Sequence, residues 1–279
     1  MTSDIAAPTV LSSTDMDTCE VASVPGGRLA YYTHRAPAKE GVNQDSLAFL
    51  DCGGNSGVLA IADGAGGMRA GEQASRTALD VLMASIREVA QEGGPLRDGI
   101  LTGIERANRA VLDLAIGALT TLAVAEISAG TVRTYHVGDS VILVVGQRGK
   151  IKLQTVSHSP VGYAVEAGVL DEGEAMHHEE RHLVSNFIGT ADMRVEMGST
   201  LELASRDTVL LASDGLADNL HTDEIVQAVR MGALSESLQS LVERTVQRMG
   251  TETGEHPCKP DDLSVLLYRK DWLVASGRG

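Results

Sequence analysis

One short pattern occurs twice in this chain, and it constrains the fold more than any other feature of the sequence. Residues 57–64 read GVLAIADG, and residues 208–215 read TVLLASDG. Each copy is an apolar run of the length of a buried strand, and each ends in an Asp-Gly step, at Asp63 and at Asp214. The glycine lets the backbone turn sharply or lets another segment approach closely. Two such strand ends placed together would direct two carboxylates at one point, which is how proteins hold a hard divalent cation.

An Asp-Gly step taken alone is more often a turn than a pair of ligands. Three further aspartates favour the ligand interpretation, because they also lie at the boundaries of predicted strands. Asp139 follows a strand-like run, whereas Asp45 and Asp261 each precede one. The starts and ends of neighbouring strands share an edge in an antiparallel sheet. The pattern therefore predicts an antiparallel core with one acidic, metal-binding rim.

The order of the predicted elements indicates an α+β fold in layers. Strands are followed by a helix pair, a β-meander, an irregular segment at 158–195, a strand, a second helix pair and a final strand, so that each helix pair covers a sheet. We expect one domain over residues 21–270, between a flexible leader at 1–20 and a tail at 271–279. The predicted helices are 71–89, 96–116, 222–231 and 235–249, and the predicted strands are 28–33, 46–50, 58–62, 120–127, 131–137, 141–145, 151–153, 209–213 and 263–268.

Composition excludes several classes of protein. The chain has 279 residues, enough for one large core, and its net charge of −15 without a basic stripe argues against a nucleic-acid partner. The chain has no apolar run that approaches the roughly 18–20 residues of a membrane span, and its first residues lack the features of a signal peptide. Three scattered cysteines suit a reducing compartment, so we expect a cytoplasmic protein without a membrane partner.

Six short motifs, in their order and spacing, resemble those of the metal-dependent protein phosphatases (the PPM, or type 2C, family) in their bacterial form. They are Asn43-Gln44-Asp45, Ala62-Asp63-Gly64-Ala65-Gly66-Gly67, Thr120-Thr121, Val137-Gly138-Asp139-Ser140, Ser213-Asp214-Gly215 and Asp261-Asp262-Leu263-Ser264. The resemblance extends over about residues 28–269. It implies a central sandwich of two antiparallel β-sheets flanked by pairs of α-helices, a four-layer αββα arrangement, with a flap insert near 158–195.

The resemblance also implies a set of ligands for Mg²⁺ or Mn²⁺. Asp63 would bridge two ions, and the carbonyl of Gly64 would reach one of them. Asp214 and Asp261 would complete the shell of the first ion. Asp45 would hold water molecules on the second ion and, with Asp63, take part in catalysis.

By the same resemblance, Asp139 would belong to a looser third-metal site near the flap. Oxygen ligands suit small hard cations, whereas zinc favours histidine and cysteine. A water bridging two Mg²⁺ or Mn²⁺ ions would attack the phosphate of phosphoserine or phosphothreonine in line, without a phosphoenzyme. The expected partners are phosphorylated proteins, with a cognate Ser/Thr kinase in the same pathway.

The chain departs from the family at the residue that holds the substrate phosphate. The family often carries an arginine five residues before the aspartate of the first motif, and here Glu40 stands in that place. Arg35 and Lys39, in the loop 34–42, are the candidate replacements. Ala65 stands where animal members carry a histidine as the general acid, and bacterial-type members also lack that histidine.

Two classes of function follow. The first is a Ser/Thr phosphoprotein phosphatase, and it is favoured by the complete set of carboxylates, because clustered aspartates repel one another unless a cation neutralises them. The second is a non-catalytic relative that binds a partner through the same fold, and the missing arginine favours it. Cysteine-based phosphatase chemistry is excluded, because an arginine does not stand six positions after any of the three cysteines.

Overall fold

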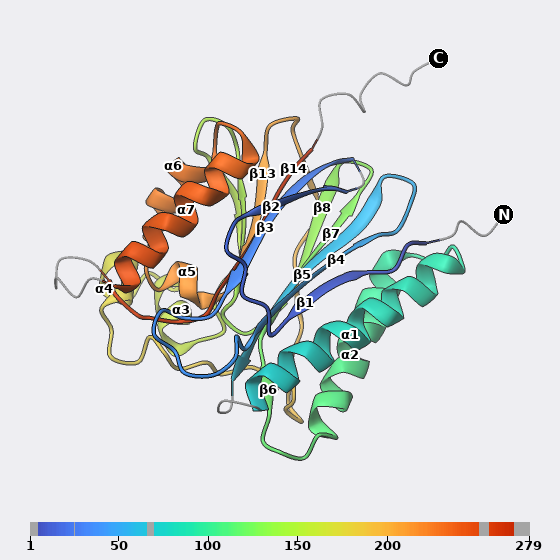
Figure 1. Cartoon of the computed structure of the whole chain (residues 1–279), viewed down its shortest axis with the longest axis horizontal. Helices are drawn as coiled ribbons and strands as arrows, with labels where there is room; N and C mark the ends of the chain where they lie inside the picture. The colour runs from blue at the N-terminus through green and yellow to red at the C-terminus, as the bar shows by residue number, and fades with distance from the viewer. Residues whose placement is uncertain (1–4, 25, 66–69, 251–256, 271–279) are drawn as a thin grey trace.

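The computed structural model describes residues 5–24, 26–65, 70–250 and 257–270 (Figure 1). Within these residues all strand pairs are antiparallel, which confirms the sheet type predicted from the sequence. The strands form an eight-stranded sheet in the order β1-β4-β5-β7-β8-β11, with β6 beside β5 and β12 beside β8. A second, six-stranded sheet has the order β10-β9-β13-β14-β3-β2.

The predicted motifs lie where strands of the two sheets begin or end. The first sheet contains β1 (Thr9–Ser12), β4 (Asp45–Asp51), β5 (Ser56–Ala65), β6 (Leu119–Thr120), β7 (Leu122–Ser128), β8 (Thr131–Val137), β11 (Glu196–Met197) and β12 (Leu201–Glu202). The second contains β2 (Glu20–Val24), β3 (Gly27–His34), β9 (Val141–Val145), β10 (Ile151–Gln154), β13 (Thr208–Ala212) and β14 (Leu263–Lys270).

Alternating side chains of β5 enter two separate hydrophobic clusters. Val58, Ala60 and Ala62 belong to the cluster shared with the first helix pair, whereas Leu59 and Ile61 belong to the cluster that lies between the two sheets and extends to the second helix pair. Successive side chains of a strand point to opposite faces, so one strand supplies both layers. The duplicated apolar runs of the sequence are therefore strands that are buried on both faces.

Two helix pairs cover the outer faces of the sandwich (Figure 1). Helices α1 (Ala70–Gln91) and α2 (Leu96–Leu112) pack on the first sheet, and α6 (Thr222–Val229) and α7 (Leu234–Met249) pack on the second. This arrangement confirms the four-layer αββα fold. Helix α2 ends four residues before the predicted boundary, and the chain beyond it turns through positive φ at Ala115 (53°) and Gly117 (68°).

The expectation of a flexible leader at 1–20 is wrong for part of that segment. Residues 9–12 form β1, which pairs with β4, and Glu20 begins β2, which pairs with β3. All four residues of β1 are half-buried, so this edge strand lacks the alternation of buried and exposed side chains that marks a strand in a sequence. Residues 1–4 and the predicted tail at 271–279 lie outside the described residues.

The predicted flap at 158–195 contains two short helices, α3 (Pro160–Glu166) and α4 (Glu172–Met176). They lie at the same end of the sandwich as α5 (Asp214–Ala217), which directly follows β13 (Figure 1). Among the helices of the described residues, none combines the length and the apolar character needed to cross a membrane.

Candidate metal centre

Two of the predicted aspartates form a cross-strand pair in the first sheet. Asp45 begins β4 and lies directly opposite Asp63, near the end of β5. The backbone N–H of Asp63 donates to Thr121 Oγ1 at 3.1 Å, and that of Asp45 donates to Asn43 Oδ1 at 3.0 Å. Like charges that face each other across an antiparallel ladder destabilise it. The first sheet thus holds two carboxylates rigidly at positions where a cation between them would stabilise the fold.

The other three predicted aspartates lie at the same rim. Asp214 follows β13 and Asp261 precedes its antiparallel neighbour β14, so both stand at one edge of the second sheet. Asp139 lies in the turn between β8 and β9, and Val141 at the start of β9 pairs with Ala212 at the end of β13. The structure therefore brings together five aspartates from loops and strand ends of both sheets.

Burial and repulsion from neighbouring carboxylates raise the pKa values of Asp45, Asp63 and Asp139. Burial, followed by the charge of Asp45, raises the pKa of Asp63 well above its ordinary value. Burial and the charge of Asp262 do the same to the pKa of Asp45, which is 1% exposed. Burial and the charge of Asp214 raise the pKa of Asp139 to about 8. Ionised carboxylates at this rim are thus costly, and a bound cation would remove that cost.

Two oxygen atoms at the rim fit a hard cation. Within the described residues, Asp45 Oδ1 and Asp214 Oδ1 are buried and accept no hydrogen bond. Buried acceptors of this kind are rare, because an unpaired buried polar atom costs free energy. The other oxygen of Asp45 accepts a 2.7 Å hydrogen bond from Ser213 Oγ, which fixes the orientation of the carboxylate. An all-oxygen set with unpaired, oriented carboxylates suits Mg²⁺ or Mn²⁺.

The glycines of the duplicated motif are required for close approach. A Cβ atom on Gly64 would lie 2.1 Å from the carbonyl oxygen of Gly71 in α1, and one on Gly215 would lie 2.1 Å from the carbonyl oxygen of Asp262. Real Cβ atoms do not come this close to backbone atoms. Each Asp-Gly step therefore lets a second backbone segment pack against its glycine, in α1 for the first copy and just before β14 for the second.

Two residues at the rim were not predicted, Lys259 and Asp218. The Lys259 Nζ atom lies 2.6 Å from Asp214, 2.7 Å from Asp218 and 3.3 Å from Asp261. Burial disfavours the charge of Lys259, but these carboxylates outweigh burial and raise its pKa, so the side chain is a cation. The spacing Asp214-x-x-x-Asp218 could have indicated that both carboxylates share one side of a helical turn. The sequence holds no comparable signal for Lys259.

Lys39, one candidate for phosphate binding, is the counterion of a buried carboxylate. Its Nζ atom lies 2.5 Å from Asp262 Oδ2 and 2.9 Å from Gln44 Oε1. Asp262 is 2% exposed and also accepts hydrogen bonds from the backbone N–H groups of Ala36 and Gln44. Lys39 and Asp262 therefore hold the loop 34–42 against the start of β14.

Arg35, the other candidate, is more accessible. Its side chain is 44% exposed, donates from Nη1 to the carbonyl of Gly41 at 2.8 Å, and lies 3.4 Å from Asp15. An exposed ion pair of this length contributes little stability. Arg35 can therefore leave its partners at lower cost than Lys39. Glu40, in the place of the family's arginine, is exposed to solvent.

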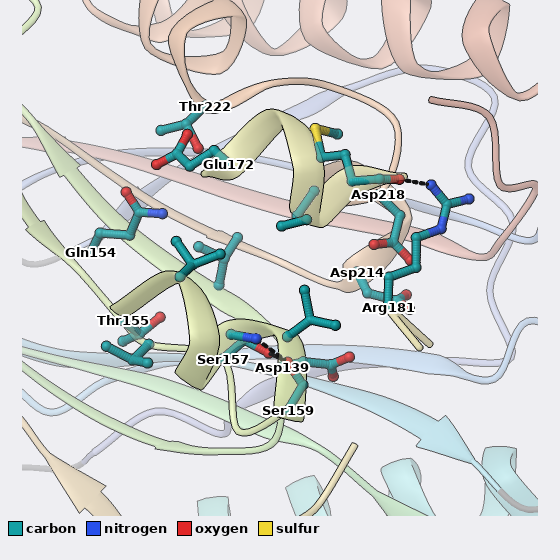
Figure 2. A pocket seen from close by; sticks show the side chains of 18 of the residues that line it. Asp139, Gln154, Thr155, Ser157, Ser159, Glu172, Arg181, Asp214, Asp218 and Thr222 are labelled. Carbon is teal, nitrogen blue, oxygen red and sulfur yellow. Dashed lines mark hydrogen bonds between the residues drawn. The ribbon is translucent and has the colours of Figure 1, made fainter. Parts of the chain in front are cut away.

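A cavity of about 360 Å³ adjoins the rim, between the flap and the second sheet. Asp139, Asp214 and Asp218 line one part of it, and Figure 2 shows Asp214 and Asp218 beside Arg181 of the flap. Apolar side chains of α3, α4 and β9 line much of the remainder. Three carboxylates of the rim thus face this cavity.

A second group of possible metal ligands consists of His136, His158 and Glu196, whose ligand atoms lie within 4.8 Å of one another. The backbone N–H of Gly138 donates to His158 Nδ1, so the proton of the neutral ring is on Nε2, 3.3 Å from Glu196. The two imidazole rings are stacked, with centroids 4.4 Å apart and an interplanar angle of 25°. Lone pairs in nearly parallel planes do not converge on one ion, so the stacking of the two rings is unfavourable for a shared cation.

Comparisons with known proteins indicate the family of the chain. The chain matches the family model of protein phosphatase 2C over residues 34–263. The serine/threonine phosphatase Stp of Listeria monocytogenes is 26% identical over 249 residues, which are 85% of this chain and 93% of that protein. The serine/threonine phosphatase of S. agalactiae has a TM-score of 0.74 at 27% identity and covers 91% of this chain and 100% of its own. The PPM Ser-Thr phosphatase MsPP from Mycobacterium smegmatis, in complex with cacodylate, has a TM-score of 0.72 at 26% identity, with coverage of 89% and 100%. The matched range contains all five predicted aspartates.

Proposed function

Because the chain belongs to the protein phosphatase 2C family, we propose that it is a metal-dependent phosphatase that hydrolyses phosphoserine and phosphothreonine in proteins. The main support for this proposal is the rim of five aspartates from both sheets. In the part of the chain that the structure describes, one buried oxygen on Asp45 and one on Asp214 have no hydrogen-bond partner. The relatives named as Ser/Thr phosphatases support the same substrate class. One of them was solved with cacodylate, a tetrahedral oxyanion like phosphate.

We assign the ligand roles by the family resemblance. Asp63 would bridge two Mg²⁺ or Mn²⁺ ions, with the Gly64 carbonyl beside it. Asp214 and Asp261 would complete the set around the first ion. Asp45, oriented by its hydrogen bond from Ser213, would hold water molecules around the second. Asp139 would serve a looser third ion.

A pair of divalent cations, when bound, lowers the pKa of a water molecule and neutralises phosphate charge. Hydrolysis then forms a bond from phosphorus to the water oxygen and breaks the bond to the serine or threonine oxygen, which takes up a proton and leaves as the alcohol. Asp45 and Asp63 lie on strands and Asp214 begins α5 directly after β13, and such anchored positions suit the fixed geometry that in-line attack needs. Arg35 is the better candidate to orient the phosphate, because Lys39 is tied to the buried Asp262.

We further propose a cytoplasmic location and a cognate Ser/Thr kinase in the same pathway. Cys19, Cys52 and Cys258 are free thiols, which suits a reducing compartment. The kinase follows from the reaction, since a phosphoprotein phosphatase requires an enzyme that makes its substrate.

The test is hydrolysis of p-nitrophenyl phosphate and of a phosphothreonine peptide, each with Mn²⁺ and with a chelator. We expect Mn²⁺-dependent release of phosphate from both. The competing function is a non-catalytic module that binds a partner through this fold, and the ion-pair partners of Arg35 and Lys39 are the observation in its favour. That alternative predicts Mn²⁺ binding without phosphate release from either substrate.

A further inference from the structure

We propose that Lys259 is an intrinsic cation that competes with a divalent metal ion for Asp214, Asp218 and Asp261. Metal binding at these carboxylates would then require the ammonium group to move away from them. This inference rests on the proposed metal-dependent function. Beyond that function, it assigns to Lys259 a role in setting the affinity for the metal ion.

The geometry around Lys259 is that of a small cation site. An ammonium group has three N–H donors, and three carboxylates lie within 2.6, 2.7 and 3.3 Å of Nζ. All four side chains are partly buried, with 24% of Lys259, 16% of Asp214, 19% of Asp218 and 36% of Asp261 exposed. The ammonium group therefore neutralises carboxylates that would otherwise repel one another in a poorly solvated place.

The competition is direct at Asp214 and Asp261. Both are proposed ligands of the first metal ion, and both now contact Lys259. The Oδ2 atom of Asp214 accepts a hydrogen bond from Lys259 Nζ. Its Oδ1 atom is buried and accepts no hydrogen bond within the described residues. A divalent ion bound to these carboxylates would lie close to a positive charge, and the low effective dielectric of the site makes that repulsion strong.

The side chain of Lys259 can move without its backbone. The N–H group of Lys259 donates to Asn219 Oδ1 at 2.9 Å, and its carbonyl accepts from Asn219 Nδ2 at 2.8 Å. Asn219 is fully buried, so the position of the backbone is fixed. The flexible four-carbon stem of lysine lets Nζ rotate toward solvent from this anchor. Displacement of the ammonium group thus leaves the backbone of Lys259 in place.

The test compares Mn²⁺ affinity by isothermal titration calorimetry in the wild type, Lys259→Met and a matched control, Lys152→Met. Lys152 is 27% exposed and lies 2.5 Å from the buried Asp207, which precedes β13 at the end opposite Asp214. Loss of the competing charge should lower the Kd of Lys259→Met for Mn²⁺ on the order of tenfold. The Kd of Lys152→Met should equal that of the wild type.

Thermal melting gives an independent readout. Without metal, Lys259→Met should melt below the wild type, because its carboxylates lose their cation, and saturating Mn²⁺ should close most of that gap. A purely structural lysine, as expected for Lys152, would give the same deficit with and without Mn²⁺. If Lys259→Met does not fold, Lys259→Gln, which keeps a donor without the charge, should also bind Mn²⁺ more tightly than the wild type.

Unchanged or weaker Mn²⁺ binding by the folded Lys259 variant would overturn the inference and leave the proposed function intact. Absence of Mn²⁺ binding in the wild type and the variant together would overturn both.

Discussion

Ser213 connects the two sheets at the candidate metal centre, and its removal gives a stability change that can be worked out from the contacts. The side chain is fully buried. Its Oγ atom donates to Asp45 Oδ2 in the first sheet at 2.7 Å and accepts from the backbone N–H of Ser264 in the second sheet at 3.0 Å. Ser213→Ala would delete the hydrogen bond to the carboxylate and leave the N–H group of Ser264 without this acceptor.

Both losses have known magnitudes. A hydrogen bond contributes about 0.5–1.5 kcal/mol between neutral groups and about 1.5–3 kcal/mol to a charged group, and a buried donor left unpaired costs about 1–3 kcal/mol. The two losses together should lower the free energy of unfolding by about 1.5–6 kcal/mol. Since unfolding entropy is about 2.1 cal/mol/K per residue, a chain of this length should lose about 3–10 °C in Tm.

Ser46→Ala is the matched control for this measurement. Ser46 is also fully buried, but its Oγ atom contacts the neutral hydroxyl of Ser75 at 2.9 Å. Ser75 has a second partner in the carbonyl of Gln44, so the control should cost only about 1 kcal/mol. Denaturant unfolding of both variants, in chelator, gives the comparison. A loss for Ser213→Ala no greater than that for Ser46→Ala would refute the assigned role of Ser213.

Three further predictions test the rim and the loop before it. Asp63→Ala should lose nearly all Mn²⁺-dependent phosphatase activity, and a wild-type rate with p-nitrophenyl phosphate would contradict its bridging role. The pKa of Asp139 is raised to about 8, so the folded state holds this proton more tightly than the unfolded chain does. Stability in chelator should therefore fall as the pH rises from about 4 towards 8, by up to about 1.4 kcal/mol per pH unit, and Asp139→Asn should weaken this trend in Tm. Arg35→Ala should raise KM with an unchanged Kd for Mn²⁺. Lys39→Ala should mainly lower Tm, because it removes the ion-pair partner of the buried Asp262. If instead Lys39→Ala raises KM and Arg35→Ala only lowers Tm, Lys39 is the residue that binds the phosphate.

Strands buried on both faces were predictable, because their apolar runs are long and bounded by turn residues. The run at 57–64 became β5, and the strand predicted at 131–137 became β8 with the same boundaries. The edge strand β1 was missed, because its hydrogen bonds to β4 depend on tertiary pairing rather than on a local pattern. The same limit applies to the two-residue strands β11 and β12, which pair with β8.

At the site, the sequence predicted the carboxylates but not the lysine side chains that neutralise their charge. Strand boundaries and antiparallel pairing place Asp45 and Asp63 at one edge, and this follows from local patterns. Lys259 contacts Asp214, which is 45 residues away along the chain, and spacing over such a distance carries no information about contact. The ion pairs of Lys259 and the Lys39–Asp262 ion pair join residues that are distant in the sequence, so they could be identified only from the folded structure.

The division of the aspartates between two sheets has a consequence for folding kinetics. Asp45 and Asp63 belong to one sheet, and Asp214 and Asp261 flank strands of the other, so the full ligand set forms only when the two sheets dock. Because closing a long loop costs entropy before its contacts form, we expect contacts between such distant segments to form after the transition state. An interaction that is absent from the transition state slows unfolding and leaves the folding rate unchanged. Bound Mn²⁺ should therefore lengthen the lifetime of the folded protein without speeding its formation, and stopped-flow unfolding and refolding rates with and without the ion would separate the two effects.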